Sequence, residues 1–311
     1  ATGMAPAAIS FAGPGKTDRE LEAAIAAGII INLESRGEMQ RADAIARRLG
    51  REPMVALRVN PDFELKASGM QMGGGPKPFG IDAEEVPAIL EEMRATNLIF
   101  NGFHIFAGSQ NLQAAAIVEC QAKTLALAVR LAAHAPRVPR QVNIGGGFGL
   151  PYFPGDQALD LASVAGHLAS ALPAVRAALP EAEIVLELGR YLVGESGVYI
   201  CRIVDRKVSR GQVFLVTDGG LHHQLAASGN FGQVLRKNYP VAIADKMDAA
   251  AVETVNIVGC LCTPLDRLAD QVVLPRAAVG DLVAVFLAGA YGRSASPTDF
   301  LGHPPPVEML V

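Results

Sequence analysis

The stretch VNIGGGFGLPYFPG, residues 142–155, joins an apolar run to three consecutive glycines. Glycine weakens a strand, so a triplet directly after one needs a physical reason. One reason is close approach of backbone N–H groups to a phosphate, which glycine turns permit. The other is an ordinary flexible turn, because glycine runs are common in loops. These residues alone leave both interpretations open.

The first two-thirds of the chain repeats this alternation of apolar runs with helical patterns. Helix starts are indicated by Thr17 with Glu20, Ser35 with Glu38 and residues 82–85, and Gly50 is placed as a helix C-cap. Alternating units of this kind predict an α/β fold with a parallel sheet, either doubly wound or closed as a barrel. A closed barrel has eight strands. Six strands are predicted: AAISFAG (7–13), GIIINLE (28–34), MVALRVN (54–60), LIFNGFHIF (98–106), RQVNIGG (140–146) and EIVLELG (183–189).

The pattern changes after about residue 200. From there, β-branched segments follow one another with short polar turns, and only NFGQVLRKN (230–238) shows a helical pattern. This is typical of an antiparallel β domain. We therefore predict two domains, residues 1–205 and 206–311.

Composition and charge exclude several classes of function. The chain has 311 residues, 50% of them hydrophobic, and a formal net charge of −4. No basic run suggests nucleic-acid binding, no apolar stretch is long enough to span a bilayer, and the N-terminus does not resemble a signal peptide. The four cysteines match neither a disulfide framework nor a zinc motif. We expect a cytoplasmic protein that binds a small molecule, with no metal, membrane or nucleic-acid partner.

Polar residues gather where the predicted strands end. Catalytic groups of β/α barrels lie at the carboxyl ends of their strands, so this clustering favours an enzyme. The residues concerned are His104, Ser109, Gly145, Gly146, Gly147, Glu187, Gly189 and Arg190.

Five ordered motifs carry a resemblance to a known family: GFHIFAGSQN (102–111), VNIGGGFGLPY (142–152), LELGRYL (186–192), GCLCTPLD (259–266) and GDLVAVFLAGAYG (280–292). Together they resemble the pyridoxal-phosphate-dependent amino-acid decarboxylases of the diaminopimelate/ornithine decarboxylase type, which have the alanine-racemase-like fold. FAGPGK, PYFPGD, LVTDGGLHHQLAASGNFGQV and HPPPVEMLV are further similar to the subgroup associated with exosortase gene clusters.

The resemblance implies a (β/α)8 barrel of the TIM type followed by an antiparallel β domain, in a homodimer with shared active sites. About six of the eight barrel strands are present. The family's lysine, which forms a Schiff base with the cofactor, belongs to an N-terminal strand that has no match in this sequence. Lys16 is an alternative, but it follows a different strand and resembles a helix start of the family.

The resemblance also implies residues that bind pyridoxal 5′-phosphate. Glu187 matches the carboxylate that pairs with the pyridine nitrogen, and its alternative role is that of a buried ion-pair partner. Phe106 takes the place of the family's ring-stacking histidine. His104, two residues earlier, is either a cofactor-side residue or a hydrogen-bonded core histidine. The phosphate is expected near Ser109, Gly145, Gly146, Gly147, Gly189, Arg190 and Tyr291; for Tyr291 the alternative is an ordinary half-buried tyrosine.

Cys262 resembles the cysteine that the partner subunit supplies to protonate the α-carbon after decarboxylation. Alone, it would be interpreted as a small buried hydrophobe. Asp266 matches the acid four residues later. Thr263 stands where diaminopimelate decarboxylases have an acidic residue, which argues against diaminopimelate as substrate. His222 and His223 are predicted substrate contacts.

The leading hypothesis is therefore the pyridoxal-phosphate-dependent decarboxylation of an amino acid or an amino-acid conjugate. A racemase on the same scaffold is a second enzyme hypothesis, which the residues around Glu187 and Cys262 disfavour. A non-catalytic relative that keeps the fold without the lysine is the third hypothesis.

Overall fold

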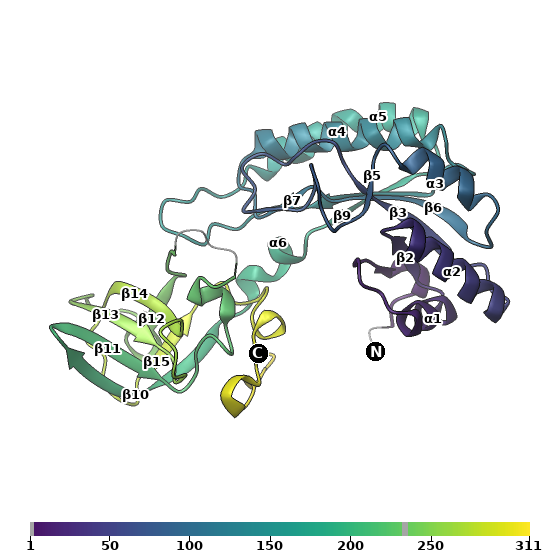
Figure 1. Ribbon diagram of the computed structural model, residues 1–311. Helices are drawn as coiled ribbons and strands as arrows, with labels where there is room; N and C mark the ends of the chain where they lie inside the picture. The colour runs from purple at the N-terminus through teal and green to yellow at the C-terminus, as the bar shows by residue number, and fades with distance from the viewer. Residues whose placement is uncertain (1–2, 232–235) are drawn as a thin grey trace. The chain divides into compact units, whose positions relative to one another are not determined.

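The computed structural model describes residues 3–231 and 236–311 (Figure 1). The chain forms two compact units: the first consists of residues 1–148 and 159–188, and the second of 149–158 and 189–311. The boundary that we expected after residue 205 falls inside β10 (Tyr199–Ser209), which pairs on both sides within the second unit. The division therefore lies at the end of β9 (Glu183–Glu187), before the β domain's first strand.

The first unit is built on a parallel sheet. Its strands run in the order β1-β2-β3-β6-β8-β9, and every neighbouring pair is parallel. All six predicted strands are confirmed: β1 (Ser10–Phe11), β2 (Ile30–Leu33), β3 (Met54–Asn60), β6 (Ile99–Ile105), β8 (Gln141–Gly146) and β9 (Glu183–Glu187). A short strand, β5 (Ile81–Asp82), also pairs with β3.

Helices alternate with these strands, and α4 and α5 lie side by side along the sheet (Figure 1). The helices are α1 (Asp18–Ala27), α2 (Arg36–Leu49), α3 (Val86–Met93), α4 (Ala114–Ala132) and α5 (Leu161–Ala178). One continuous core joins them to the sheet, with Leu57, Phe103 and Val142 from the strands. Because successive strand side chains alternate between faces, the residues next to these in sequence point to the opposite face of the sheet.

The predicted helix ends are partly confirmed. Thr17 forms the full reciprocal cap with Glu20, and Gly50 closes α2 in the left-handed conformation. The Ser35 hydroxyl caps α2 by accepting from the Glu38 amide. The Glu38 carboxylate accepts from the Glu34 amide, so the reciprocal half of the cap is not formed. The start predicted at residue 82 is wrong. α3 begins at Val86 without a side-chain cap, because the Asp82 carboxylate accepts a hydrogen bond from the Asn60 side chain at 2.7 Å.

The second unit contains a six-stranded sheet in the order β12-β15-β10-β11-β13-β14. Besides β10, the strands are β11 (Gln212–Thr217), β12 (Val241–Ile243), β13 (Glu253–Val258), β14 (Arg267–Leu274) and β15 (Leu282–Val285). The antiparallel prediction is confirmed for four pairings and is wrong for β11 with β13, which are parallel. The long connection over residues 218–252 makes this possible, because parallel neighbours need a crossover rather than a hairpin.

Two short strands, β4 (Met70–Gln71) and β7 (Gly108–Ser109), form a separate antiparallel pair. α6 (Gly189–Val193) begins the longer segment of the second unit, residues 189–311. Of the residues 230–238, where a helical pattern was expected, 232–235 lie outside the described residues, and the described residues on either side are not helical. In the described ranges, no helix has both the length and the apolar character needed to cross a bilayer.

Candidate active site

Glu187, the last residue of β9, is held by two neighbouring strands. His104 Nε2 lies 3.0 Å from Glu187 Oε2, and the Asn143 side-chain amide donates to Glu187 Oε1 at 2.9 Å. Arg58, His104 and Asn143 are register partners across β3, β6 and β8, so they share one face of the sheet. His104 is buried, whereas 41% of the Glu187 side chain is exposed. The carboxylate is thus fixed on one side and open on the other.

Glu187 is ionised at neutral pH. Burial acts to raise the pKa of its carboxyl. The opposite effects are larger in sum: the hydrogen bond and charge of His104, the hydrogen bond from Asn143 and the charge of Arg58 together hold the pKa below its usual value. An ionised carboxylate only accepts hydrogen bonds, so His104 Nε2 carries the shared proton. Among the described residues, His104 Nδ1 has no hydrogen-bond partner.

The glycine triplet after β8 has a packing reason. A Cβ on Gly146 would lie 2.0 Å from the Glu187 carbonyl oxygen, and one on Gly147 would lie 2.0 Å from the Gly108 carbonyl oxygen. Gly145 and Gly147 have φ of +67° and +78°, which favours glycine. The Gly145 amide also donates to the Asn143 side-chain oxygen at 2.9 Å. The turn is therefore tightly packed, which disagrees with the flexible-turn alternative.

The same turn contacts the loop that follows β6. A Cβ on Gly145 would lie 2.7 Å from Phe106 Cδ2, so the phenylalanine ring lies directly against the turn. Ser109 follows Gly108 in β7, where it pairs with Met70. The first unit therefore brings together the predicted residues His104, Phe106, Ser109, Gly145, Gly146, Gly147 and Glu187.

Asn143 is a site residue that the sequence analysis missed. Its side chain links the glycine turn to Glu187, with one hydrogen bond to each. The available signal was a polar residue inside an apolar strand, two positions before Gly145 and thus on the same face. Arg58 was also missed; its guanidinium donates to Glu34 at 2.8 Å, and both side chains are buried.

Lys16 has a structural role. Its buried ammonium donates to the carbonyls of Gly13 and Asn32 at 2.6 and 2.8 Å, and to Glu38 at 2.8 Å. These bonds use all three ammonium protons. This arrangement agrees with the expectation that Lys16 does not replace the family's cofactor lysine.

In the second unit, Arg190 lies between aromatic rings. Its guanidinium donates to the Tyr152 hydroxyl at 3.0 Å and lies 4.4 Å from the centre of the Tyr291 ring. The guanidinium is thereby held over the rings by cation–π attraction. Tyr291 is exposed and has a φ of +55°, and Gly189 has open space at its Cβ position.

Cys262, Thr263 and Asp266 lie on the loop between β13 and β14. Cys262 is exposed, which disagrees with the small-hydrophobe alternative. The buried Asp266 carboxylate accepts from the amides of Leu221 and Leu261 at 2.7 and 2.9 Å. Burial raises the pKa of Asp266, against the effect of these amides. The described contacts of Asp266 hold the loop that carries Cys262 and Thr263.

The two predicted substrate-contact histidines differ in their surroundings. His223 is bonded through both ring nitrogens, to the Tyr199 hydroxyl at 3.0 Å and to the Pro304 carbonyl at 2.8 Å. His222 is fully buried, and neither of its nitrogens has a partner in the described part of the chain. Burial lowers the pKa of His222 to about 4, so its ring is neutral at physiological pH.

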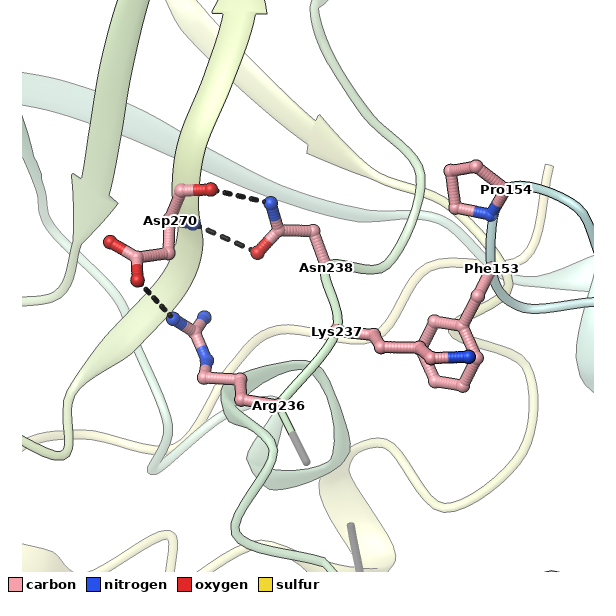
Figure 2. Close-up of a pocket in the computed structure, with 6 residues that line it drawn as sticks. All are labelled: Phe153, Pro154, Arg236, Lys237, Asn238 and Asp270. Atoms are coloured by element: carbon pink, nitrogen blue, oxygen red, sulfur yellow. Dashed lines mark hydrogen bonds and ion pairs between the residues drawn. The ribbon is translucent and has the colours of Figure 1, made fainter. Parts of the chain in front are cut away.

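A surface depression in the second unit contains none of the predicted site residues (Figure 2). In it, the Asn238 side chain exchanges two hydrogen bonds with the Asp270 backbone, and Arg236 pairs with the Asp270 carboxylate at 3.9 Å. The Lys237 ammonium lies over the Phe153 ring. Because these groups chiefly contact one another, we assign the depression no part in the reaction.

Comparison with known proteins shows the family. Residues 1–194 match the model for the pyridoxal-binding domain of pyridoxal-dependent decarboxylases. L-glutamyl-[BtrI acyl-carrier protein] decarboxylase of Niallia circulans is 38% identical over 308 residues, covering 97% of this chain and 72% of that protein. Diaminopimelate decarboxylase of Archaeoglobus fulgidus is 32% identical over 307 residues, covering 97% and 71%.

A solved structure agrees with these matches. Diaminopimelate decarboxylase from Helicobacter pylori, complexed with L-lysine, superposes with a TM-score of 0.82 at 26% identity, covering 94% of this chain and 71% of that one. The resemblance stated from the motifs is confirmed, and so are the α/β barrel-type fold with its β domain and the pyridoxal cofactor. The chain belongs to the pyridoxal-dependent decarboxylase family.

Proposed function

We propose that this decarboxylase removes the α-carboxylate of an amino acid or an amino-acid conjugate, and that Glu187 binds the ring nitrogen of pyridoxal phosphate. The observation that carries the proposal is the state of Glu187: an ionised carboxylate, oriented by His104 and Asn143, with an open side. Such a group favours a protonated pyridine nitrogen.

The residues present fit the cofactor. When bound, pyridoxal phosphate supplies a ring that withdraws electrons from the α-carbon as carbon dioxide leaves. His104 and Asn143 bind both carboxylate oxygens of Glu187, and the ionised carboxylate would pair with the ring nitrogen. Phe106 offers an apolar face beside the turn, without a titratable nitrogen.

Phosphate binding is proposed for the backbone N–H groups and side chains that match the family's phosphate-binding motifs. Glycine turns present such N–H groups to anions, and a guanidinium binds phosphate oxygens well. Arg190 Nε has no partner among the residues described, whereas its Nη1 is held by Tyr152. The proposed phosphate group comprises Ser109, Gly145, Gly146, Gly147, Gly189, Arg190 and Tyr291.

Cys262 is the proposed proton donor to the α-carbon, supplied by a second copy of the chain in a homodimer. Its exposed position on a loop is compatible with delivery across an interface. Substrate contacts are proposed for Thr263, Asp266, His222 and His223. The location proposed for the enzyme is the cytoplasm.

The substrate class that we favour is an amino-acid conjugate. Thr263 provides no carboxylate for a distal ammonium, unlike the acidic residue of diaminopimelate decarboxylases. The relative from Niallia circulans is named for an L-glutamyl group carried on an acyl-carrier protein, which is such a conjugate.

Carbon dioxide release tests this proposal. The full-length protein, loaded with pyridoxal phosphate, is assayed with diaminopimelate, lysine, ornithine, free glutamate and a glutamyl thioester. We expect release from at least one substrate, and a fall in kcat/KM of about 100-fold or more in Glu187→Gln. Cys262→Ala is expected to slow the reaction, whereas the matched control Cys120→Ala, in α4, keeps the rate.

Two results would contradict decarboxylation. Inversion of the α-carbon without carbon dioxide release indicates a racemase. Cofactor binding without turnover of any substrate in the panel supports a non-catalytic relative.

A further inference from the structure

Three potential metal ligands converge in the second unit from distant parts of the sequence. His222 precedes a short 3-10 helix (Leu225–Ser228), Cys260 follows β13, and His303 lies in the C-terminal segment. One ring nitrogen of each histidine and the Cys260 Sγ all lie within 4.8 Å of one another. Their spacing matches no metal-binding motif, so only the fold reveals the cluster.

We propose that His222, Cys260 and His303 form a binding site for a divalent transition-metal ion, with Zn²⁺ as the best match. Two imidazoles and one thiolate are ligands that zinc accepts, and three protein ligands leave a fourth position for water. Carboxylate-preferring Mg²⁺ and Ca²⁺ do not suit this set.

His222 is the strongest support for the site. Its side chain is fully buried, and neither ring nitrogen has a hydrogen-bond partner in the described ranges. Buried polar atoms are nearly always partnered, so two unpartnered nitrogens on one ring require an explanation. The ring centre lies 5.2 Å from that of His303, which places the two imidazoles around a common point. A bound ion would occupy one of these nitrogens.

The distances within the cluster are close to those of a zinc site. Cys260 Sγ lies 3.7 Å from His303 Nδ1. Tetrahedral zinc, with bonds of about 2.3 Å to sulfur and about 2.05 Å to nitrogen, separates these two atoms by about 3.6 Å. Cys260 and His303 already have this separation, and His222, which lies within the 4.8 Å limit of the cluster, would need to move by no more than about 1.5 Å.

Metal binding would change the bonding of the Cys260 thiol. The Cys260 thiol now points at the Asp218 carbonyl, at 3.7 Å. On metal binding, the S–H bond is replaced by a sulfur–metal bond and the proton passes to water, with no change of oxidation state.

The site has a structural consequence. It would tie the C-terminal segment carrying His303 to the loop that begins at Cys260, two residues before the proposed proton donor Cys262. The metal proposal does not depend on catalysis, because metal binding is measured without turnover.

Metal content of the untagged, full-length protein tests the proposal. The protein is stripped with a chelator, exposed to a slight excess of Zn²⁺, desalted and analysed by mass spectrometry of the metal. We expect one zinc per chain. Cys260→Ser and His303→Gln should each weaken zinc binding at least about tenfold, whereas Cys262→Ser, on the same loop, retains the metal.

Cobalt provides an independent readout. Co²⁺ added to the stripped protein should give a sulfur-to-cobalt charge-transfer band that is absent in Cys260→Ser and present in Cys262→Ser. Circular dichroism verifies that each variant is folded. The His222→Gln variant is compared with the others only when its spectrum shows that it is folded. The proposal is overturned if the folded wild type retains no zinc, or if Cys260→Ser and His303→Gln bind it as tightly as the wild type.

Discussion

At the scale of single residues, Asn143 organises the candidate site. Its amide nitrogen binds Glu187 and its amide oxygen binds the Gly145 backbone, so one side chain connects the proposed ring-nitrogen carboxylate to the proposed phosphate turn. This makes Asn143 a positioning residue, because it contacts both of the groups that we propose to bind the cofactor.

The ionisation of Glu187 should be visible in the pH dependence of stability. Its carboxyl has a pKa below the ordinary value of 4.5 in the folded protein. The ionised form therefore stabilises the fold, fully above the unfolded-state pKa, and this contribution is lost as the pH falls through the lower, folded-state value. We expect the difference in urea midpoint between the wild type and Glu187→Gln to be constant from pH 6 to 8. Below pH 4.5, the wild type should lose stability relative to Glu187→Gln.

A difference that stays constant down to pH 3 would show that Glu187 does not titrate in this way. Glu183→Gln, at the exposed start of the same strand, is the matched control for the removal of one carboxylate.

Gly146 is expected to tolerate no side chain. The Cβ of Gly146→Ala would meet the Glu187 carbonyl oxygen at 2.0 Å, and neither backbone segment can move without disturbing the strand pair. Overpacking of this kind costs about 3 kcal/mol, which lowers the apparent Tm by at least about 5 °C. Thermal unfolding followed by circular dichroism measures the shift.

Gly166 is the control for this substitution. It lies within α5, and no atom of the described residues lies within 4 Å of its Cβ position. Gly166→Ala should leave the Tm unchanged or raise it, because alanine is the better helix former by about 1 kcal/mol. Equal effects at the two positions would contradict the packing argument.

At the scale of elements, the ends of the strands bring the site residues together. The helix caps determine at which residue each helix begins. Ser35 is the N-cap of α2, and its hydroxyl accepts a hydrogen bond from the Glu38 amide at 3.1 Å. Glu38 in turn accepts from the Glu34 amide and binds the buried Lys16. The start of α2 is thus tied to the buried Lys16 ammonium.

Ser35→Ala should lower the free energy of unfolding by about 1 kcal/mol, because the Glu38 amide loses its acceptor. The comparable position of α3, Glu85, makes no side-chain cap bond. Glu85→Ala is therefore expected to change stability by less than about 0.5 kcal/mol. Urea unfolding of both variants checks the pair, and a loss at Glu85 as large as that at Ser35 would refute the assignment of the cap.

At the scale of the whole molecule, the proposed groups are divided between two units. Glu187 and the glycine turn belong to the first unit, and Arg190, Tyr291 and Cys262 belong to the second. The proposed homodimer adds a further division, because Cys262 is assigned to the site of the partner.

Mixing two inactive variants tests this sharing. The two single variants, Glu187→Gln and Cys262→Ala, are each slow alone. They are mixed in equal amounts, dissociated into subunits and allowed to reassociate. If Cys262 acts across the interface, half of the dimers are mixed and each has one intact site, which restores about a quarter of wild-type activity. Without sharing, each mixed dimer retains both defects in separate sites and activity stays at the level of the single variants.

The sequence by itself determined the six parallel strands, the helix ends at Thr17, Ser35 and Gly50, and the positions of Glu187 and the glycine turn. These follow from local physics: a continuous apolar run favours a buried parallel strand, and capping residues act within a few positions of the helix end. The five ordered motifs, residues 102–111, 142–152, 186–192, 259–266 and 280–292, together indicated the family.

Only the tertiary structure decided which residues meet. The partners that require Gly146 and Gly147 to lack a Cβ are carbonyl oxygens of other strands, 41 and 39 positions away along the chain. The parallel pairing of β11 with β13, the division at residue 188 and the convergence of His222, Cys260 and His303 also depend on long-range packing. Such contacts leave no periodic signal in the sequence, because their spacing is determined by the path of the chain between the elements and not by the geometry of any one of them.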